Sequence, residues 1–152
     1  MCDVQLGDEP TLSINDDHDD KKLKNSSSKR VLPVTTPLLN LLSELTAGKG
    51  KNEHLFSLPY SEQNGYTGKP SKYFSGLLKS LDIKGVSFHS LRHYVVTELF
   101  NLGVKEELIG ALMGHSVGKL TTGKVYLSGF SYQVKIRAIS HLMLNMDEID
   151  YL

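Results

Sequence analysis

The sequence has a single cysteine, no long apolar run and no basic residue near its start. Cys2, alone among 152 residues, excludes an internal disulfide framework and favours a reducing compartment. No apolar run has the length that a membrane-spanning helix needs, and the first residues lack the pattern of a secretory signal. We therefore expect a cytoplasmic protein that does not contact a membrane.

Charge is distributed unevenly, although the formal net charge is zero. Residues 1–20 contain seven acids and no lysine or arginine, and residues 147–152 contain three more acids. Residues 21–146 therefore hold all 17 basic residues against the remaining 7 acids, a net charge of +10. Such a basic body favours a phosphate-bearing partner, although a solvated surface with uneven charge would show the same pattern.

The N-terminal part is predicted to form β structure. Residues 11–15 alternate apolar and polar as a half-buried strand does, and residues 29–34 are predicted as the returning strand. The polar residues 16–28 between them indicate a long hairpin loop. Pro33 cannot donate a ladder hydrogen bond, which favours a position at a strand end or edge.

Helices are predicted for most of the remaining chain. The first has Thr36 as its N-cap, Pro37 at the first helical position and Gly48 just past its end. A short strand is predicted at 54–56. Further helices are predicted over 70–82, 90–102, 105–113 and 131–144. The fold class is thus α+β, mostly α, with an N-terminal β-hairpin or small antiparallel sheet packed beside a helical bundle.

Apolar residues recur at helical spacing in these segments, so we expect them to face the core. They are Leu38, Leu41, Leu42, Leu45, Phe74, Leu77, Leu78, Leu81, Leu91, Val95, Leu99, Leu102, Val134, Ile136, Ile139 and Leu142.

Three side chains that can carry positive charge lie together at the start of one predicted helix. His89 and Arg92 are three residues apart and project from nearly the same side, and His93 follows. A helix N-terminus carries partial positive charge, and a guanidinium can bind phosphate through two hydrogen bonds. The cluster therefore indicates an anion site, with a surface arginine and a core histidine as the alternative.

A second group of residues follows the next predicted helix. Gly114 is predicted as a left-handed cap, which would project His115 from the helix end at a fixed angle. Tyr126 stands eleven residues later. Taken alone, such residues are more often a capping histidine and a packing tyrosine.

Taken together, these segments are more specific. "HSLRH" (89–93), "LMGHS" (112–116) and "TTGKVY" (121–126) resemble the C-terminal half of the tyrosine recombinase (phage integrase) catalytic domain. "KKLKNSSSKRVLPV" (21–34) resembles the β-hairpin of that family, which carries a catalytic lysine and runs into an R-x-x-P strand. The resemblance covers the chain from about residue 3 to residue 142.

The resemblance implies a role for each matching residue. Arg92 is similar to the second catalytic arginine, which binds the scissile phosphate. His89 resembles the histidine of the H-x-x-R box, and His115 the His or Trp position of the G-H box. Tyr126 resembles the nucleophile and Lys24 the hairpin lysine.

Some of these assignments have competitors. Tyr132 competes with Tyr126 but lies farther from His115 than the family usually allows. His93 is expected only to support the site. Lys24 has three competitors in and beside the hairpin loop, namely Lys21, Lys22 and Lys29. We also expect the acids of residues 16–20 to hold the hairpin away from the site until DNA binds.

The implied function is site-specific DNA recombination or integration through a 3′-phosphotyrosyl intermediate, without a metal or cofactor. The expected partners are double-stranded DNA and further copies of the chain, in a tetrameric synapse on DNA, with a free monomer also possible. The expected location is the cytoplasm, on nucleoid DNA. Whether the last helix packs on its own domain or docks on a neighbouring protomer stays open.

The family also has a first catalytic arginine before the hairpin and a separate N-terminal DNA-grasping domain. We therefore expect residues 1–146 to be a partial catalytic domain, with an acidic tail over 147–152. Arg30 and Arg137 are predicted to stand in the wrong places to replace the first arginine. Cleavage by the chain alone is accordingly expected to be severely impaired.

Two other functions fit parts of the sequence. Residues 90–115 also resemble a helix–turn–helix, which would make the chain a DNA-binding module without chemistry. The acidic start and apolar remainder of the second helix count against base reading. A metal enzyme using His89, His93 and His115 is the third hypothesis, but Arg92 beside a cation is electrostatically unfavourable.

Overall fold

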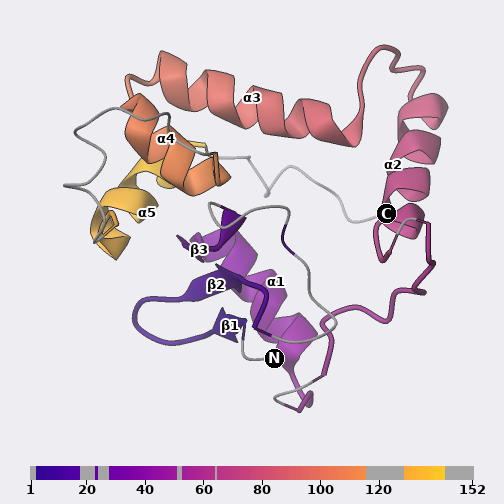
Figure 1. Cartoon of the computed structure of the whole chain (residues 1–152), viewed down its shortest axis with the longest axis horizontal. Coiled ribbons are helices and arrows are strands. Elements are labelled where there is room, and N and C mark those ends of the chain that lie inside the picture. The colour runs from indigo at the N-terminus through magenta and orange to yellow at the C-terminus, as the bar shows by residue number, and fades with distance from the viewer. Residues whose placement is uncertain are drawn as a thin grey trace.

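A computed structural model describes residues 3–17, 23, 28–50, 53–63, 65–115 and 129–142. In these residues a small antiparallel sheet precedes a set of α-helices, so the predicted α+β, mostly α class is confirmed (Figure 1). Helix α3 (Phe88–Asn101) runs along one side of the molecule, and α4 (Glu106–Met113) and α5 (Tyr132–Ser140) lie at one of its ends.

The sheet contains the predicted hairpin and one additional short strand. Its order is β1 (Val4–Gln5), β2 (Thr11–Ile14) and β3 (Arg30–Pro33), all antiparallel. Thr11 pairs with Pro33, and Ile14 pairs with Arg30. Pro33 is the last residue of β3, which is an edge strand, as predicted. A proline is tolerated there because the end of an edge strand does not require its missing N–H.

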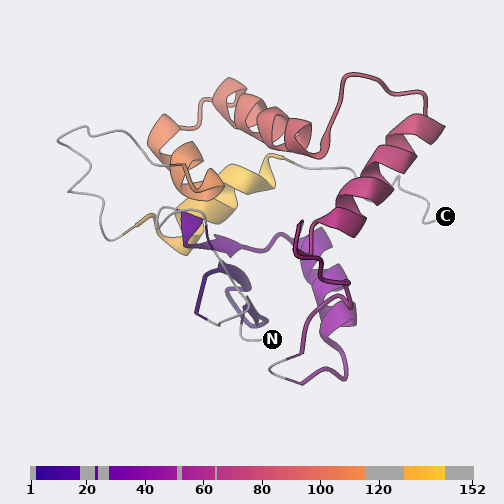
Figure 2. The same ribbon diagram turned by 45° about the vertical axis from the view of Figure 1, so that its right-hand side comes forward.

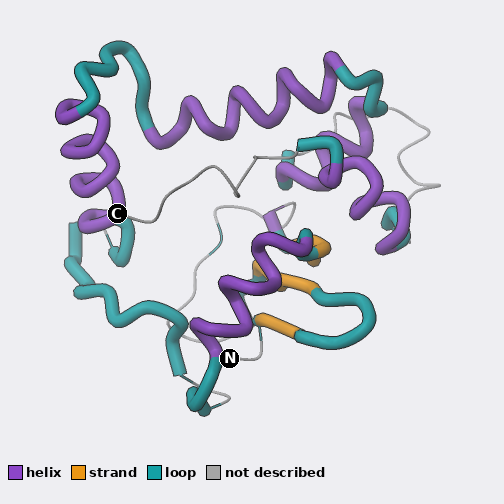
Figure 3. Tube along the Cα trace, turned by 180° about the vertical axis from the view of Figure 1, so that it is seen from behind, coloured by secondary structure: helices purple, strands orange, loops and turns teal. Residues whose placement is uncertain are grey.

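Helix α1 follows β3 after two residues. It spans Thr36–Thr46, and its N-cap is Thr35 rather than the predicted Thr36, which places Pro37 at the second helical position. Figure 1 shows α1 beyond the sheet, whereas Figure 3, from the opposite side, shows it in front of the strands. Leu42 of this helix is buried.

The predicted strand at 54–56 is wrong. Lys49 donates from Nζ to the carbonyls of His54 and Leu55, both at 3.1 Å, so a side chain occupies acceptors that a strand would need. Ser61 and Gly65 form an isolated antiparallel bridge nearby. Helix α2 (Gly68–Ser80) follows this segment.

The core lies where β3, α3, α4 and α5 meet. Leu99 is fully buried, and Leu32 of β3 packs against the same cluster. The other buried members are Leu108, Ile109, Leu112 and Ala138. Burial of these side chains fixes α4 against the second half of α3.

Several apolar side chains expected in the core are exposed instead. The largest differences are at Leu81 (60% exposed), Leu102 (50%) and Leu91 (46%). None of the residues of α2, all of which the structure describes, is buried. Helix α2 stands apart from α4 and α5 in both views (Figures 1 and 2), and an edge contact between Phe74 and Phe88 at 4.9 Å joins it to α3.

Candidate active site

The first turns of α3 present the predicted cluster of His89, Arg92 and His93. Ser87 precedes the helix in extended conformation, and its N–H donates to the hydroxyl of Ser90 at 3.0 Å. This capping box begins the helix directly before His89. The rings of His89 and His93 meet edge to face at 4.8 Å, and both side chains are exposed.

Arg92 points from α3 to the end of α4. Its Nη2 donates to the carbonyl of Met113 at 2.5 Å, and the residue is half-buried. Helix C-termini carry partial negative charge, which favours a guanidinium there. The contact brings the H-x-x-R segment next to the G-H segment, 21 residues away in sequence.

Gly114 has the left-handed conformation that the sequence predicted, with φ 69° and ψ 36°. The N–H of the next residue, His115, donates to the carbonyl of Gly110 at 3.0 Å, which closes the end of α4. His115 therefore leaves the helix at a fixed position, with its side chain exposed. Arg92 and His115 thus reach the same helix end from two directions.

Arg30 also reaches this helix end, a contact that its expected place in the returning strand did not reveal. Its Nε donates to the carbonyl of Leu112 at 2.9 Å, across 82 residues of sequence, and its Nη1 donates to the carbonyl of Ser28 at 2.7 Å. Sequence reasoning judged Arg30 by its strand and could not see which helix that strand packs against. The only local signal was the R-x-x-P pattern itself.

The two arginines influence each other. Burial lowers the pKa of the Arg30 guanidinium, and the positive charge of Arg92 lowers it further. Within the ranges that the structure describes, neither arginine forms an ion pair with a carboxylate. The pair therefore has backbone carbonyls as partners and carries positive charge that an anion can neutralise.

Tyr126 and Lys24, the predicted nucleophile and general acid, lie outside the described residues, as do Lys21 and Lys22. Their placement in the site accordingly stays a prediction.

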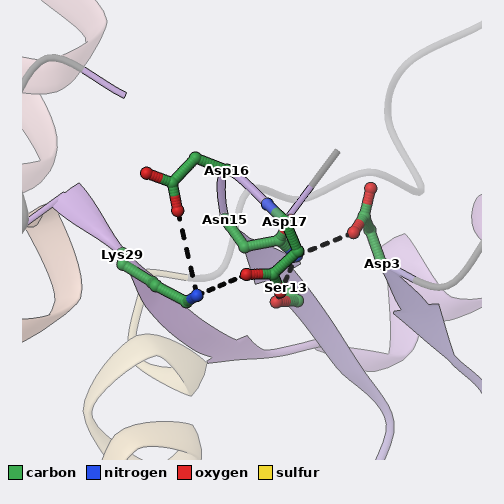
Figure 4. Close-up of polar contacts among 6 residues, drawn as sticks. All are labelled: Asp3, Ser13, Asn15, Asp16, Asp17 and Lys29. Atoms are coloured by element: carbon green, nitrogen blue, oxygen red, sulfur yellow. Dashed lines mark hydrogen bonds and ion pairs between the residues drawn. The ribbon is translucent and has the colours of Figure 1, made fainter. Parts of the chain in front are cut away.

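Lys29, a competitor of Lys24, pairs with acids at the base of the hairpin (Figure 4). Its Nζ lies 2.5 Å from a carboxylate oxygen of Asp17 and 3.8 Å from one of Asp16. The hydrogen bond that Lys29 donates to Asp17 is the main cause that raises the pKa of Lys29. The amide of Asn15 donates to Asp3 at 2.8 Å in the same group. Lys29 is thereby paired with the segment that follows β2.

Tyr132, the competitor of Tyr126, is the first residue of α5. Burial raises the pKa of its phenol, and the negative charge of Glu9 raises it further. Gln133 donates to the same carboxylate at 3.5 Å. A carboxylate beside the phenol disfavours both phenolate formation and the approach of phosphate.

The metal hypothesis has no support in the geometry. No group of three or more His, Cys, Asp or Glu side chains in the described part of the chain is placed to hold a metal ion. His89, His93 and His115 all belong to that part, so they do not form the required ligand set.

The helix–turn–helix hypothesis also fits poorly. The second helix of such a motif must present side chains to DNA bases, but α4 buries Leu108, Ile109 and Leu112 in the core. Its first turn carries Glu106 and Glu107, which repel phosphate. Separately, no described helix is long and apolar enough to cross a membrane.

The hairpin strand, the H-x-x-R helix and the G-H helix end meet here, as the resemblance to the tyrosine recombinase catalytic domain implies. A comparison with family models agrees, since the model described as the phage integrase family matches residues 10–129. That span is most of the chain, and the chain belongs to the phage integrase family. Neither a curated protein nor a solved structure matches it. Family membership supports site-specific recombination as the activity and DNA as the partner.

Proposed function

We propose that the chain cleaves and rejoins DNA at specific sites through a covalent 3′-phosphotyrosyl intermediate, with Tyr126 as the nucleophile. Arg92, His89 and His115 stabilise the phosphate during the reaction, and Lys24 is the general acid. His93 supports this group. Residues 1–146 contain this partial catalytic domain, and residues 147–152 are an acidic tail.

One observation carries the proposal. Arg92 from α3 and Arg30 from β3 both donate to carbonyls at the last turn of α4, directly before His115. Three segments that are distant in sequence are thereby joined at one helix end, and no described carboxylate neutralises the two arginines. The two arginines therefore keep positive charge beside His115, which attracts a phosphate.

The reaction requires no change of oxidation state. The phenolic oxygen of Tyr126 forms a bond to phosphorus, and the bond from phosphorus to the 5′ oxygen breaks. The phenol proton passes to a histidine, and Lys24 donates a proton to the departing 5′ oxygen. Attack by a 5′ hydroxyl reverses each step and rejoins the strand.

In this scheme the side chains around the phosphate must stabilise the negative charge of the phenolate and of the transition state. A free tyrosine has a pKa of about 10, so forming phenolate at pH 7 costs about 4 kcal/mol. Fixed donors around the non-bridging oxygens stabilise the negative charge that develops in the transition state. The half-buried guanidinium of Arg92, held by Met113, is already oriented for this purpose.

We further propose that the 152-residue chain by itself cleaves slowly. Arg30 belongs to β3, after the hairpin loop, and donates from Nε and Nη1 to backbone carbonyls, so we do not assign it the role of the first catalytic arginine. Arg137 is exposed on α5, a helix that contributes neither the H-x-x-R nor the G-H segment. One missing donor in such a site costs a factor on the order of 10² to 10³ in rate.

Assembly of four copies on DNA, in a synapse associated with the nucleoid, also belongs to this proposal. Chemical crosslinking with and without the cognate duplex tests it, and a tetramer should form only with DNA.

The test of the main proposal is covalent capture on nicked DNA. The full-length protein is incubated with duplexes from the recombination site of its own element. A nick close to the cleavage point lets the short fragment with the free 5′ hydroxyl diffuse away, so that the strand cannot be rejoined. We expect a protein–DNA adduct that survives denaturation and vanishes in Tyr126→Phe. The matched variant Tyr132→Phe should keep the adduct.

Loss of the adduct in Tyr132→Phe but not in Tyr126→Phe would overturn the choice of nucleophile. Tight binding to the same duplex without any adduct would instead favour a non-catalytic DNA-binding module.

A further inference from the structure

The contact between Arg30 and Gly114 has a role that the family assignment does not supply. Gly114 is both left-handed and in contact with a neighbour. A β-carbon built on it would lie 2.5 Å from Nη1 of Arg30 and 3.0 Å from its Cζ. The guanidinium therefore occupies the space that a side chain at position 114 would fill.

Gly103 provides a comparison, since it is also a left-handed glycine at a helix end, one residue beyond the C-cap of α3. Its φ is 74°, but nothing lies within 4 Å of a β-carbon built there. Gly103 therefore needs only its backbone freedom, whereas Gly114 needs backbone freedom and also empty space. The second requirement comes from Arg30.

Arg30 connects three segments through this space. Its Nε bonds the carbonyl of Leu112 in the last turn of α4, and its Nη1 bonds that of Ser28 at the hairpin base. Arg92 bonds the adjacent carbonyl of Met113. A shift of Arg30 would thus free the hairpin strand from α4 and alter the direction in which the chain continues to His115.

We propose that Arg30 is a positioning residue, which occupies the space beside Gly114 and fixes His115, Arg92 and the hairpin strand relative to one another. It acts through these contacts rather than on the DNA, because its bonded N–H groups face the backbone. The expected effect of Arg30 on catalysis rests on the proposed function, whereas its contact with Gly114 is independent of that function.

The first experiment tests the contact alone, by chemical denaturation of the 152-residue chain. Gly103→Ala should lower the folding equilibrium constant by about 5- to 30-fold, the cost of a left-handed alanine. Gly114→Ala should lower it by a further factor on the order of ten, because Arg30 must leave its bonds. In an Arg30→Ala background the two glycine substitutions should have equal effects.

Equal effects in the wild-type background would overturn the proposal. The proposal would also be overturned if Gly114→Ala still lowered the folding equilibrium constant more than Gly103→Ala in the Arg30→Ala background, since another contact would then be the cause.

The second experiment separates positioning from stability, with the adduct assay at a temperature where every variant is folded. Arg30→Lys keeps the charge but cannot bond both carbonyls. We expect the adduct rate at saturating DNA to fall at least tenfold, with the DNA dissociation constant within about twofold of wild type. The control Arg137→Lys, on the exposed side of α5, should change neither.

An unchanged rate in Arg30→Lys and in Arg30→Ala would overturn the positioning role. A large rise in the dissociation constant alone would also overturn it and would make Arg30 a simple DNA contact. No adduct from the wild-type protein would overturn the proposed function instead, and the glycine comparison would then decide the contact by itself.

Discussion

Two regions of the molecule differ in how their apolar residues are used. We call the region of β3, the second half of α3, α4 and α5 the body, and the region of α2 with the first turn of α3 the arm. The body buries Leu99 completely, whereas the arm leaves Leu81 60% exposed and Phe88 53% exposed. Both regions have amphipathic helices, so amphipathicity alone does not decide burial.

The difference in burial between body and arm bears on the proposed site. Arg92 lies where the arm ends and the body begins, and its hydrogen bond goes to α4 in the body. The geometry of the proposed site therefore depends on the packing of the body, whereas the arm leaves apolar side chains exposed. Four predictions test this division, from the largest expected effect to the smallest.

The largest effect is expected at Arg92. Arg92→Gln removes a charged donor that is already oriented by Met113, so the rate of adduct formation should fall by a factor on the order of 10² to 10³. Single-turnover assays on the nicked duplex measure this rate. Arg137→Gln is the matched control and should keep the wild-type rate. A fall of less than threefold in Arg92→Gln would mean that another group binds the phosphate.

The next effect compares the stability of body and arm. Leu99→Ala should lower the free energy of unfolding by about 3 kcal/mol, because a fully buried leucine leaves a cavity. Leu81→Ala, in the arm, should change it by less than about 0.5 kcal/mol. Urea denaturation followed by circular dichroism measures both values. Equal losses would show that the arm is packed in solution as tightly as the body.

A smaller effect concerns DNA binding by the arm. Helix α2 carries the exposed Lys69, Lys72 and Lys79 and no acid. If one phosphate contact is lost in Lys72→Gln, the slope of log affinity against log salt should fall by about 0.9. The adduct rate at saturating DNA should not change. Lys105→Gln, beside two glutamates on the body, is the control, and an equal change there would contradict a specific role of the arm.

The smallest effect is the titration of Tyr132 in the body. Burial and Glu9 both raise its pKa above 10.0. The stabilisation from the neutral phenol is present below the unfolded pKa and is lost as the pH rises through the folded pKa. Absorbance titration of the wild type minus Tyr132→Phe isolates this group. Glu9→Gln should move the pKa only partly back, because burial is the larger cause. A full return to 10 would show that charge, not burial, is dominant.

The sequence predicted the elements of this fold better than their packing. The hairpin, the Gly114 cap and the helices other than their end residues follow from local rules that depend on neighbours in sequence. The exposure of Leu81 and Leu91 does not, because it depends on whether another element covers the arm. The strand expected at 54–56 failed because Lys49 takes its carbonyls.

The candidate site shows the same limit. The family resemblance of "HSLRH" and "LMGHS" implied that Arg92 and His115 belong together, and the structure places both at the end of α4. Arg30 was not recognised, since its partner Leu112 lies 82 residues away and only the packing of β3 on α4 brings them together. In the sequence, the contact is reflected in Gly114, whose lack of a side chain leaves room for the Arg30 guanidinium.

The position of Arg30 on β3 also limits how the gene can change in length. Side chains alternate between the two faces of a strand, and Arg30 shares its face with Leu32, which packs against the core. One extra codon between Arg30 and Leu32 would turn one of them to the opposite face. Insertions that keep the reading frame should therefore accumulate in the segment before Lys29 and be eliminated from the four codons of the strand.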